Sequence, residues 1–560
     1  MFKYKNYCYK LNYLDLTKHT NLLLNKNCHL KPQINQLRLR SAISTTLNEP
    51  DDDIKSTFSS EWQSAKPFEE IPTMSSFTLI RNFLPGGKYH KLDTTQFLMA
   101  LREDLGSFCK IPGSFGQTDI VFTHNVQDFE TLLRNEGIWP KRVGLEALNY
   151  HRSVYRADYF QGTEGLLATH GEKWGSFRSA VNPVLMQPKN VRLYLGKMSQ
   201  VNKEFIERIR QIRDPNTLEM PDTFEEEINR WTLESVSVVA LDKQLGLITK
   251  NRNNPMATKM FATLNEFIAL SLDVELKPSI WRYYKTKTFK KLMNSLDTLL
   301  EITTTYINEA IERLEQERLN GVKEKAEHEK SVLEKLLKID KKIATVMAMD
   351  MFMAGVDTSS STFTGLLLCL AKNPEKQAKL REEVRQILPH KDSEFTEEAC
   401  KNMPYLRACI KESLRVYPLT VGNARSPAND VVLSGYRIPK DTRVSMVSIA
   451  LLRDENHFPR ANEYLPERWL RAQKESNTNQ ATTSAHPLRP SCPFVYLPFG
   501  FGPRTCIGRR IVEMELELGI ARIVRNFQIE YNHPTDNAFK SVLMNIPNIP
   551  LKFKFTDIDV

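Results

Sequence analysis

The feature that most constrains this chain is a short loop near its C-terminal end, in which three glycines surround one cysteine. It reads Phe499-Gly500-Phe501-Gly502-Pro503-Arg504-Thr505-Cys506-Ile507-Gly508. Glycines let the backbone bend tightly, and the loop leaves no room for a second thiol ligand. The pattern favours one thiolate beneath a flat cofactor, with amide N–H groups directed at the sulfur, and we expect a haem iron with Cys506 as its axial ligand. A glycine-rich structural turn around a buried cysteine is the alternative.

The composition is that of a globular protein with a large core. Of the 560 residues, 41% are hydrophobic and 26% are charged, which excludes disordered, collagen-like and disulfide-scaffold classes. No Gly/Ser/Pro-rich linker divides the middle of the chain, so we expect one large unit after a leader. The eight cysteines show no zinc-type spacing, which indicates a reducing compartment.

Most of the basic charge lies in the first 48 residues. This segment has eight Lys and Arg residues against one Asp, so +7 of the formal net charge of +10 belongs to it. A basic, nearly acid-free leader that ends in a Ser/Thr-rich stretch after Arg40 is typical of a matrix-targeting peptide. The sequence predicts a mitochondrial presequence at 1–48 and one folded domain at 49–560. A disordered basic tail is the alternative, and no run reaches the ~18 apolar residues of a membrane span.

Hydrophobic periodicity predicts a mainly α protein with small β-sheets. The expected helices are Val201–Arg213, Phe224–Ala240, Phe289–Leu319, Ile343–Ala371, Lys376–Leu388, Glu397–Tyr417 and Arg509–Phe527. The expected strands are Asp119–Thr123, Asp430–Ile438, Val444–Ile449 and Leu551–Phe555. The segment 471–490, rich in Ser, Thr, Asn and Gln, is expected to be a surface loop.

The cysteine loop resembles the haem-binding signature of the cytochrome P450 superfamily. Four further motifs of that family follow the expected order, so that the resemblance covers the chain from about Phe68 to the end. They are Trp174-x-x-x-Arg178, Ala354-Gly355-Val356-Asp357-Thr358-Ser359, Glu412-x-x-Arg415 and Pro466-Glu467-Arg468. The resemblance implies the cytochrome P450 fold, with haem b (iron protoporphyrin IX) between a long central helix and the cysteine loop.

Several of these residues are expected to hold the haem. Arg504 is placed to reach a propionate, and Phe499 opens the haem-binding loop. Trp174 and Arg178, at i and i+4 of one helix, can donate to the same haem edge. Arg425 matches a third propionate-binding arginine of the family, although an arginine on a loop is more often solvated.

Asp357 and Thr358 are expected to deliver protons. Splitting dioxygen consumes two protons, and an acid coupled to an alcohol and water supplies them. These residues follow Gly355, where a helix is easily distorted. The alternative is a threonine that bonds back to its own helix.

Glu412 and Arg415, three residues apart, share a helix face and are expected to form a buried ion pair, to which Arg468 adds a second guanidinium. The resemblance implies that this cluster holds the cysteine loop in register with the helix. A solvated surface pair is the alternative.

Electrons must come from a partner, because the chain has no Gly-x-Gly-x-x-Gly after a strand and no Walker loop. Arg407, Lys411, Arg509 and Arg510 are expected to form a basic patch on the thiolate side. These positions resemble those with which mitochondrial members bind an acidic, adrenodoxin-like ferredoxin, itself reduced by an NADPH-dependent reductase. A solvated charged face is the alternative.

The sequence therefore predicts a haem-thiolate monooxygenase of the insect mitochondrial type, acting on a lipophilic, steroid-like or foreign substrate. We expect it at the matrix side of the inner membrane, with peripheral membrane contact and no nucleic-acid partner. A thiolate-haem isomerase or peroxide-rearranging enzyme and a non-catalytic haem sensor are the alternatives. Segments that line the family's cavity contain these residues, each of which taken singly suits plain core better: Met349, Phe352, Met353, Leu419, Val421, Leu543 and Met544.

Overall fold

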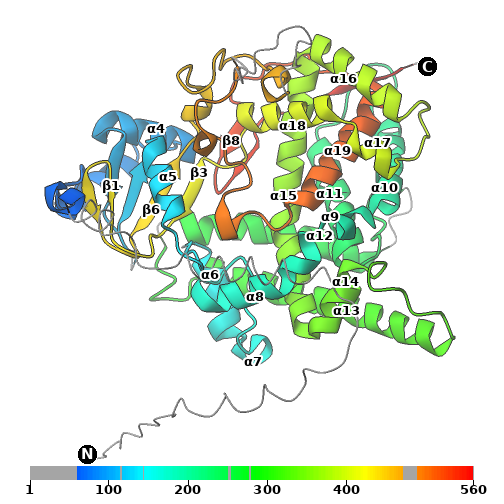
Figure 1. The fold of residues 1–560 in the computed structure, drawn as a ribbon, viewed down its shortest axis with the longest axis horizontal. Coiled ribbons are helices and arrows are strands. Elements are labelled where there is room, and N and C mark those ends of the chain that lie inside the picture. The colour runs from blue at the N-terminus through cyan, green and yellow to red at the C-terminus, as the bar shows by residue number, and fades with distance from the viewer. Residues whose placement is uncertain are drawn as a thin grey trace, which may run out of the picture. The chain divides into compact units, whose positions relative to one another are not determined.

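Long helices dominate the computed structural model, which describes residues 60–113, 117–142, 144–249, 254–276, 279–470 and 488–558 (Figure 1). Residues Ala65–Val560 form one compact unit. The predicted presequence and most of the expected surface loop at 471–490 lie outside the described residues.

The central element is helix α15 (Lys341–Lys372), which is apolar on nearly every side and buried along most of its length. A helix without a polar face has to be covered all round. Helices α11 (Phe224–Ala240), α14 (Val332–Ile339), α18 (Pro404–Val416) and α19 (Arg509–Asn526) pack against it. The side chain of Asp340 caps its first turn by accepting from the N–H groups of Lys342 and Ile343.

The helix that follows the cysteine, α19, packs on α11 and α15 around Trp231. The indole is fully buried, its ring lies 4.4 Å from that of Phe363, and its N–H donates to Asn202 at 2.9 Å. A Cβ at Gly519 would come within 2.8 Å of the indole, so only glycine lets α19 approach this closely. This packing fixes the helix that starts three residues after Cys506.

The periodicity predictions for the long helices are confirmed, with small shifts at their ends. Helix α11 has the expected bounds, while α10 (Leu195–Ile212), α13 (Lys287–Leu319) and α16 (Pro374–Ile387) begin earlier. The single helix expected at Glu397–Tyr417 is wrong. It divides into α17 (Glu397–Lys401) and α18 because Pro404 starts a new helix at its first position.

Further elements lie in the described part of the chain. Its other α-helices include α3 (Ser76–Phe83), α4 (Thr94–Leu105), α5 (Val126–Arg134), α6 (Glu146–Tyr150), α7 (Ala157–Phe160), α8 (Gly171–Leu185), α9 (Pro188–Arg192) and α12 (Pro255–Ser271). Two π-helical turns are η2 (His151–Tyr155) and η3 (Leu272–Leu276). The 3₁₀ turns are η1 (Phe68–Glu70), η4 (Leu451–Arg453), η5 (Pro466–Trp469), η6 (Pro493–Val495) and η7 (Gly502–Arg504).

The expected sheets are small. One has four strands in the order β1 (Phe108–Ile111), β2 (Ile120–Thr123), β6 (Arg443–Val447) and β3 (Gly422–Arg425). Strands β2 and β6 are parallel and the other pairs are antiparallel. Three two-stranded sheets pair β4 (Val431–Leu433) with β5 (Tyr436–Ile438), β7 (Phe527–Glu530) with β10 (Lys554–Asp557), and β8 (Phe539–Ser541) with β9 (Asn545–Pro547).

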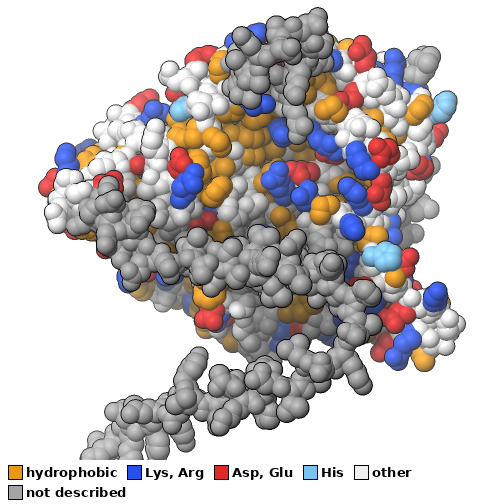
Figure 2. Space-filling model, in the orientation of Figure 1, with side chains coloured by type: hydrophobic (Ala, Val, Ile, Leu, Met, Phe, Trp, Pro, Cys, Tyr) orange, Lys and Arg blue, Asp and Glu red, His pale blue; other side chains and the backbone are white. Residues whose placement is uncertain are grey.

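The surface has a hollow with an apolar floor in the region of α15 and β8, with Lys or Arg side chains along part of its rim (Figure 2). Among the described residues no helix combines the length and hydropathy needed to cross a bilayer.

Candidate functional site

The cysteine loop (Phe499–Gly508) folds as a tight turn held by its own backbone. The N–H of Cys506 donates to the carbonyl of Phe499 at 2.9 Å. Gly500 and Gly502 have φ angles of +74° and +64°, a region that side chains with a Cβ disfavour. A Cβ on Gly502 would also collide with the carboxylate of Glu136. Two of the three glycines are therefore required by backbone geometry.

The cysteine sulfur is placed to be a ligand. Cys506 is a free thiol near the C-terminal end of the loop, and the residue is exposed to solvent. The protein atoms packed around the sulfur partly desolvate it and raise its pKa, whereas the backbone N–H groups of Gly508 and Arg509 and the charges of Arg178 and Arg142 lower it by favouring the thiolate. The expected N–H donors after the cysteine are thus present.

Arginines gather beside this loop. Arg178 donates to the carbonyl of Thr505 at 2.9 Å. Arg504 lies over the ring of buried Trp174, with 3.9 Å between guanidinium carbon and ring centroid. We call Arg142, Arg178, Arg425 and Arg504 the arginine cluster. Arg142 carries no sequence motif, and the sequence analysis missed it.

The arginine cluster has a surplus of positive charge. Burial and the neighbouring charges of Arg142, Arg425 and Arg178 lower the pKa of Arg504 to about 8. The acid that offsets them is Glu136, which accepts from Nε of Arg425 at 2.5 Å and has its other oxygen unpartnered. Like charges held together in a low dielectric repel strongly. A flat cofactor with two carboxylates would relieve this repulsion, so the residues present fit haem.

Two of the expected propionate ligands also have partners within the protein. Arg504 donates to the carbonyls of Pro140 at 2.9 Å and Thr169 at 2.7 Å, and Arg425 is ion-paired with Glu136. Both are buried rather than solvated because these protein acceptors satisfy them. Arg178 keeps an unpartnered, buried Nε.

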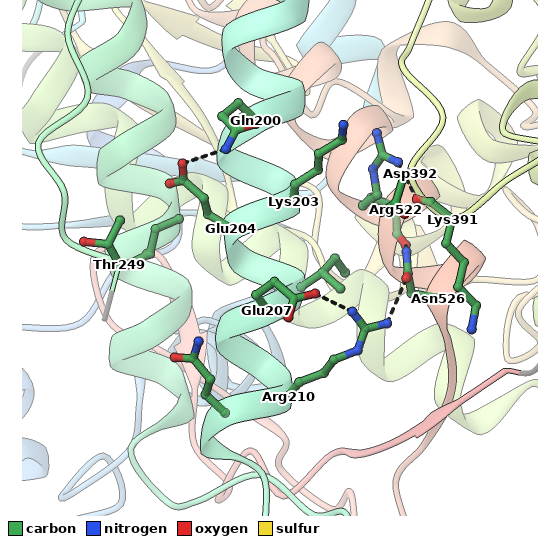
Figure 3. Close-up of a pocket in the computed structure, with 13 residues that line it drawn as sticks. Gln200, Lys203, Glu204, Glu207, Arg210, Thr249, Lys391, Asp392, Arg522 and Asn526 are labelled. Atoms are coloured by element: carbon green, nitrogen blue, oxygen red, sulfur yellow. Dashed lines mark hydrogen bonds and ion pairs between the residues drawn. The ribbon is translucent and has the colours of Figure 1, made fainter. Parts of the chain in front are cut away.

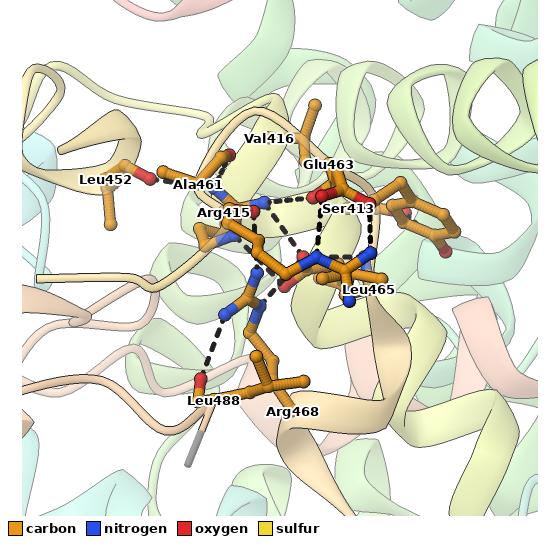
Figure 4. Close-up of polar contacts among 12 residues, drawn as sticks. Ser413, Arg415, Val416, Leu452, Ala461, Glu463, Leu465, Arg468 and Leu488 are labelled. Carbon is orange, nitrogen blue, oxygen red and sulfur yellow. Dashed lines mark hydrogen bonds and ion pairs between the residues drawn. The ribbon is translucent and has the colours of Figure 1, made fainter. Parts of the chain in front are cut away.

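Both ion pairs expected at Glu412 are formed, and all three side chains are fully buried. Glu412 accepts from Arg415 at 2.8 and 3.1 Å and from Nε of Arg468 at 3.0 Å. The outer nitrogens of the two arginines donate to backbone carbonyls of Leu452, Ala461, Glu463, Pro459, Leu488 and Arg460 (Figure 4). The network ties α18 to the chain that leads toward the cysteine loop.

A direct path links this network to the segment before the cysteine loop. The indole N–H of Trp469 donates to Glu412 at 2.8 Å, and its ring lies 4.5 Å from that of Tyr496. The hydroxyl of Tyr496 donates to the carbonyl of Lys411 at 2.8 Å. Tyr496 precedes Phe499 by three residues. The start of the loop is therefore attached to α18 in two ways, through the contact of the Tyr496 ring with Trp469 and through the hydrogen bond of its hydroxyl to Lys411.

The acid and alcohol on α15 are half-buried. Burial raises the pKa of Asp357 to about 6, near the value that suits a proton donor at neutral pH. The hydroxyl of Thr358 donates to the carbonyl of Ala354 at 2.6 Å, the back-bonded arrangement considered as the alternative. Since its proton is used in this bond, its lone pairs remain free to accept.

Glu515 on α19 is a buried acid that sequence reasoning missed. It is 1% exposed, and neither carboxyl oxygen has a hydrogen-bond partner in the described chain. Burial raises its pKa to about 8, although the hydroxyls of Ser359 and Ser235 lower it. The protonated carboxyl is therefore favoured at pH 7, beside Ser359, the residue that follows Thr358.

The residues expected to line the substrate cavity separate into two groups. Met349, Phe352 and Met353 are 5% exposed or less and belong to the main core, which agrees with the plain-core alternative, and their place in a substrate cavity stays a prediction. The others are half-buried or exposed and lie on two segments that meet, because the N–H of Asn545 donates to the carbonyl of Leu419 at 2.7 Å. These four are Leu419, Val421, Leu543 and Met544.

Two of the four expected docking cations are neutralised. Arg407 is paired with Glu517 at 2.7 Å and Arg509 with Glu513 at 2.8 Å, both acids on α19. Lys411 and Arg510 are exposed, and the described chain offers them no ion pair. The free charge of the expected patch is thus two cations rather than four.

The structure also has a polar cavity of about 330 Å³ among α10, α19 and the turn at Lys391 (Figure 3). Within its lining Arg210 is ion-paired with Glu207, whereas Lys203 pairs with Glu394 outside the lining. None of the expected site residues lines it.

A lone cysteine in a glycine-bent loop, amide groups on its sulfur and a buried cationic cluster define the site of a haem-thiolate protein. A cytochrome P450 family model matches residues 74–555. Cytochrome P450 CYP12A2 of Musca domestica is 68% identical over 501 residues, 90% of this chain and 93% of that protein. The chain belongs to the cytochrome P450 family of haem-thiolate monooxygenases.

Other relatives carry a compartment in their names. The probable mitochondrial cytochrome P450 12a5 of Drosophila melanogaster is 60% identical, with 89% of this chain and 92% of that protein covered. The probable mitochondrial cytochrome P450 12c1 of the same species is 47% identical, with 93% and 98% covered. The resemblance to insect mitochondrial members is confirmed.

Glu515 provides a test by pH. Its pKa in the folded protein, about 8, lies above the ordinary 4.5, so the unfolded chain releases this proton first and stability falls as pH rises between these values. Glu515→Gln should therefore stabilise the protein by little at pH 5 and by on the order of 3 kcal/mol at pH 8. Urea unfolding across this range measures the difference.

The matched control is Glu513→Gln, on the same helix but partly exposed. It should change the free energy of unfolding by less than about 1 kcal/mol at every pH. A Glu515→Gln curve parallel to that of the unchanged protein would show that Glu515 is ionised in the fold.

Proposed function

We propose that this protein is a ferredoxin-dependent mitochondrial monooxygenase that inserts one atom of dioxygen into a lipophilic, steroid-like or foreign substrate. The observation that carries the proposal is the combination of Cys506 and the arginine cluster with a near-neutral acid and an alcohol on α15. An apolar hollow beside α15 and β8 suits a lipophilic substrate (Figure 2).

Two alternatives are weaker. An isomerase or peroxide-rearranging enzyme does not need protons for splitting dioxygen, so Asp357 and Thr358 would have no use there. A haem sensor without turnover would need neither this pair nor exposed cations next to the thiolate helix. The combination of features favours the monooxygenase.

In this proposal the chain's residues divide the work. Cys506 would bind the haem iron, and Trp174 and the arginine cluster would hold the propionates. Bound haem supplies the activation of dioxygen. Asp357, half-protonated near pH 6, would donate protons, and Thr358 would accept a hydrogen bond from a water or from the group that is protonated.

The proposed location is the matrix side of the inner membrane, with 1–48 as a cleavable presequence. The named mitochondrial relatives support this compartment. Helix α3 supplies a surface for peripheral membrane contact, since Phe77 is 76% exposed and Ile80, Phe83 and Leu84 are also exposed. Exposed apolar side chains clustered on one short helix suit an interfacial contact.

The proposed role of Thr358 predicts a loss of coupling. Thr358→Ala should keep haem and ligand binding but divert electrons from product to peroxide, with product per electron falling about 10- to 100-fold. Thr362→Ala is the control, because Thr362 makes the same kind of back-bond one turn further along, at 2.8 Å to the carbonyl of Thr358. Measuring peroxide and product per NADPH decides between them, and equal coupling in both variants would refute the role.

The proposed electron donor predicts a charge effect at Lys411. Lys411→Glu should slow reduction by an acidic ferredoxin severalfold at low ionic strength, mainly through association, and leave reduction by dithionite unchanged. Lys290→Glu is the control, since it makes the same charge change at an exposed position of α13. Stopped-flow reduction with limiting ferredoxin measures both, and equal rates would move the docking surface away from α18.

A further inference from the structure

We propose that the buried ion pair of Asp350 and Arg152 is a positioning device, which holds residues 164–169 between α15 and the cysteine loop and so sets the cavity wall at the haem edge. The inference rests on the proposed function, because it takes Cys506 as the haem ligand. Neither residue belongs to the motifs recognised in the sequence.

The pair binds the segment directly. Asp350 and Arg152 are 2% and 0% exposed, and Oδ1 of Asp350 lies 2.8 Å from Nη2 of Arg152. The other oxygen of Asp350 accepts from the N–H of Leu166 at 2.6 Å, and Nη1 of Arg152 donates to the carbonyl of Glu164 at 2.7 Å. Two backbone groups of one short segment are thus fixed by one ion pair.

Gly165, between these two anchor points, permits the contact. Its φ is +80°, and a Cβ there would lie 2.5 Å from both Nη1 of Arg152 and Oδ2 of Asp350 and 2.9 Å from the side chain of Val346 on α15. The backbone therefore touches the ion pair and the helix with no side chain between them.

The opposite side of the segment is bonded to the cysteine loop. Arg504, two residues before Cys506, donates to the carbonyl of Thr169 at 2.7 Å and to that of Leu166 at 3.4 Å. The N–H of Leu166 is therefore bound to Asp350 on α15, which lies eight residues before Thr358. The carbonyl of Leu166 is bound to Arg504 in the cysteine loop. The segment joins the two elements on either side of the proposed haem.

The ion pair of Asp350 and Arg152 is better suited to fixing the position of the backbone than to raising the free energy of unfolding. A fully buried ion pair gains little over well-packed apolar side chains, because both charges lose their hydration. Its directional bonds, in contrast, fix where a backbone lies. Leu166 and Leu167, carried by this segment, are buried and half-buried in the main core next to α15, so a shift of the segment would move apolar wall next to the haem.

The test uses the holoenzyme and two iron-binding probes, imidazole and 4-phenylimidazole, titrated by the shift of the Soret band. Asp350→Asn should leave the dissociation constant of imidazole within about twofold, because this small ligand needs only the iron. It should weaken 4-phenylimidazole about tenfold, because the phenyl ring has to fit the wall. Arg152→Lys, which keeps the charge, should also weaken the binding of 4-phenylimidazole, but by a smaller factor.

Glu227→Gln is the matched control. Glu227 is also a buried acid, bound by Arg208 at 2.8 Å between α10 and α11, and its loss should lower the melting temperature without changing the ratio of the two dissociation constants. A ratio in Asp350→Asn and Arg152→Lys equal to that in Glu227→Gln would overturn the positioning role. Absence of any imidazole shift in the unchanged protein would instead refute the proposed haem site.

Discussion

The carboxylate of Glu412 is the interaction on which the placement of the thiolate depends. It is fully buried and accepts from Arg415, Arg468, Trp469 and the N–H of Leu465. Removing one partner of such a network leaves an uncompensated buried charge, at about 3–5 kcal/mol. The arginines also satisfy carbonyls from three separate turns of chain. Helix α18 and the approach to the cysteine loop are thereby held as one piece.

A second constraint is electrostatic and faces the cofactor. The arginine cluster places several guanidinium groups beside the loop of Cys506 with Glu136 as the offsetting acid, and burial and mutual repulsion bring the pKa of Arg504 down to about 8. Binding an anionic cofactor would remove that repulsion, so haem and fold stabilise each other. The segment at 164–169 connects the arginine cluster to α15. Arg504 donates to the carbonyl of Thr169, and Asp350 accepts from the N–H of Leu166.

Sequence patterns predicted the elements whose signal is local. Periodicity found α11 to the residue and α15 within two residues at its start and one at its end. The pair of Glu412 with Arg415 followed from i, i+3 spacing, and the pair with Arg468 followed from the family motif. The pattern did not reveal partners supplied by distant segments. Glu517 is ion-paired with Arg407 and Glu513 with Arg509, and Glu136 is ion-paired with Arg425. Arg142, Asp350 and Glu515 had no local signal, because their significance comes from burial beside side chains of other elements.

The arrangement of α18, α19 and the arginine cluster is explained if the Cys506 thiolate is the axial ligand of the haem iron. The spectrum of the reduced carbon monoxide complex reports this ligand. We expect the red-shifted Soret band of thiolate ligation in the unchanged protein and in the variant Cys492→Ala, which changes a half-buried cysteine, and loss of that band in Cys506→Ala. Persistence of the band in Cys506→Ala would contradict this assignment of the ligand.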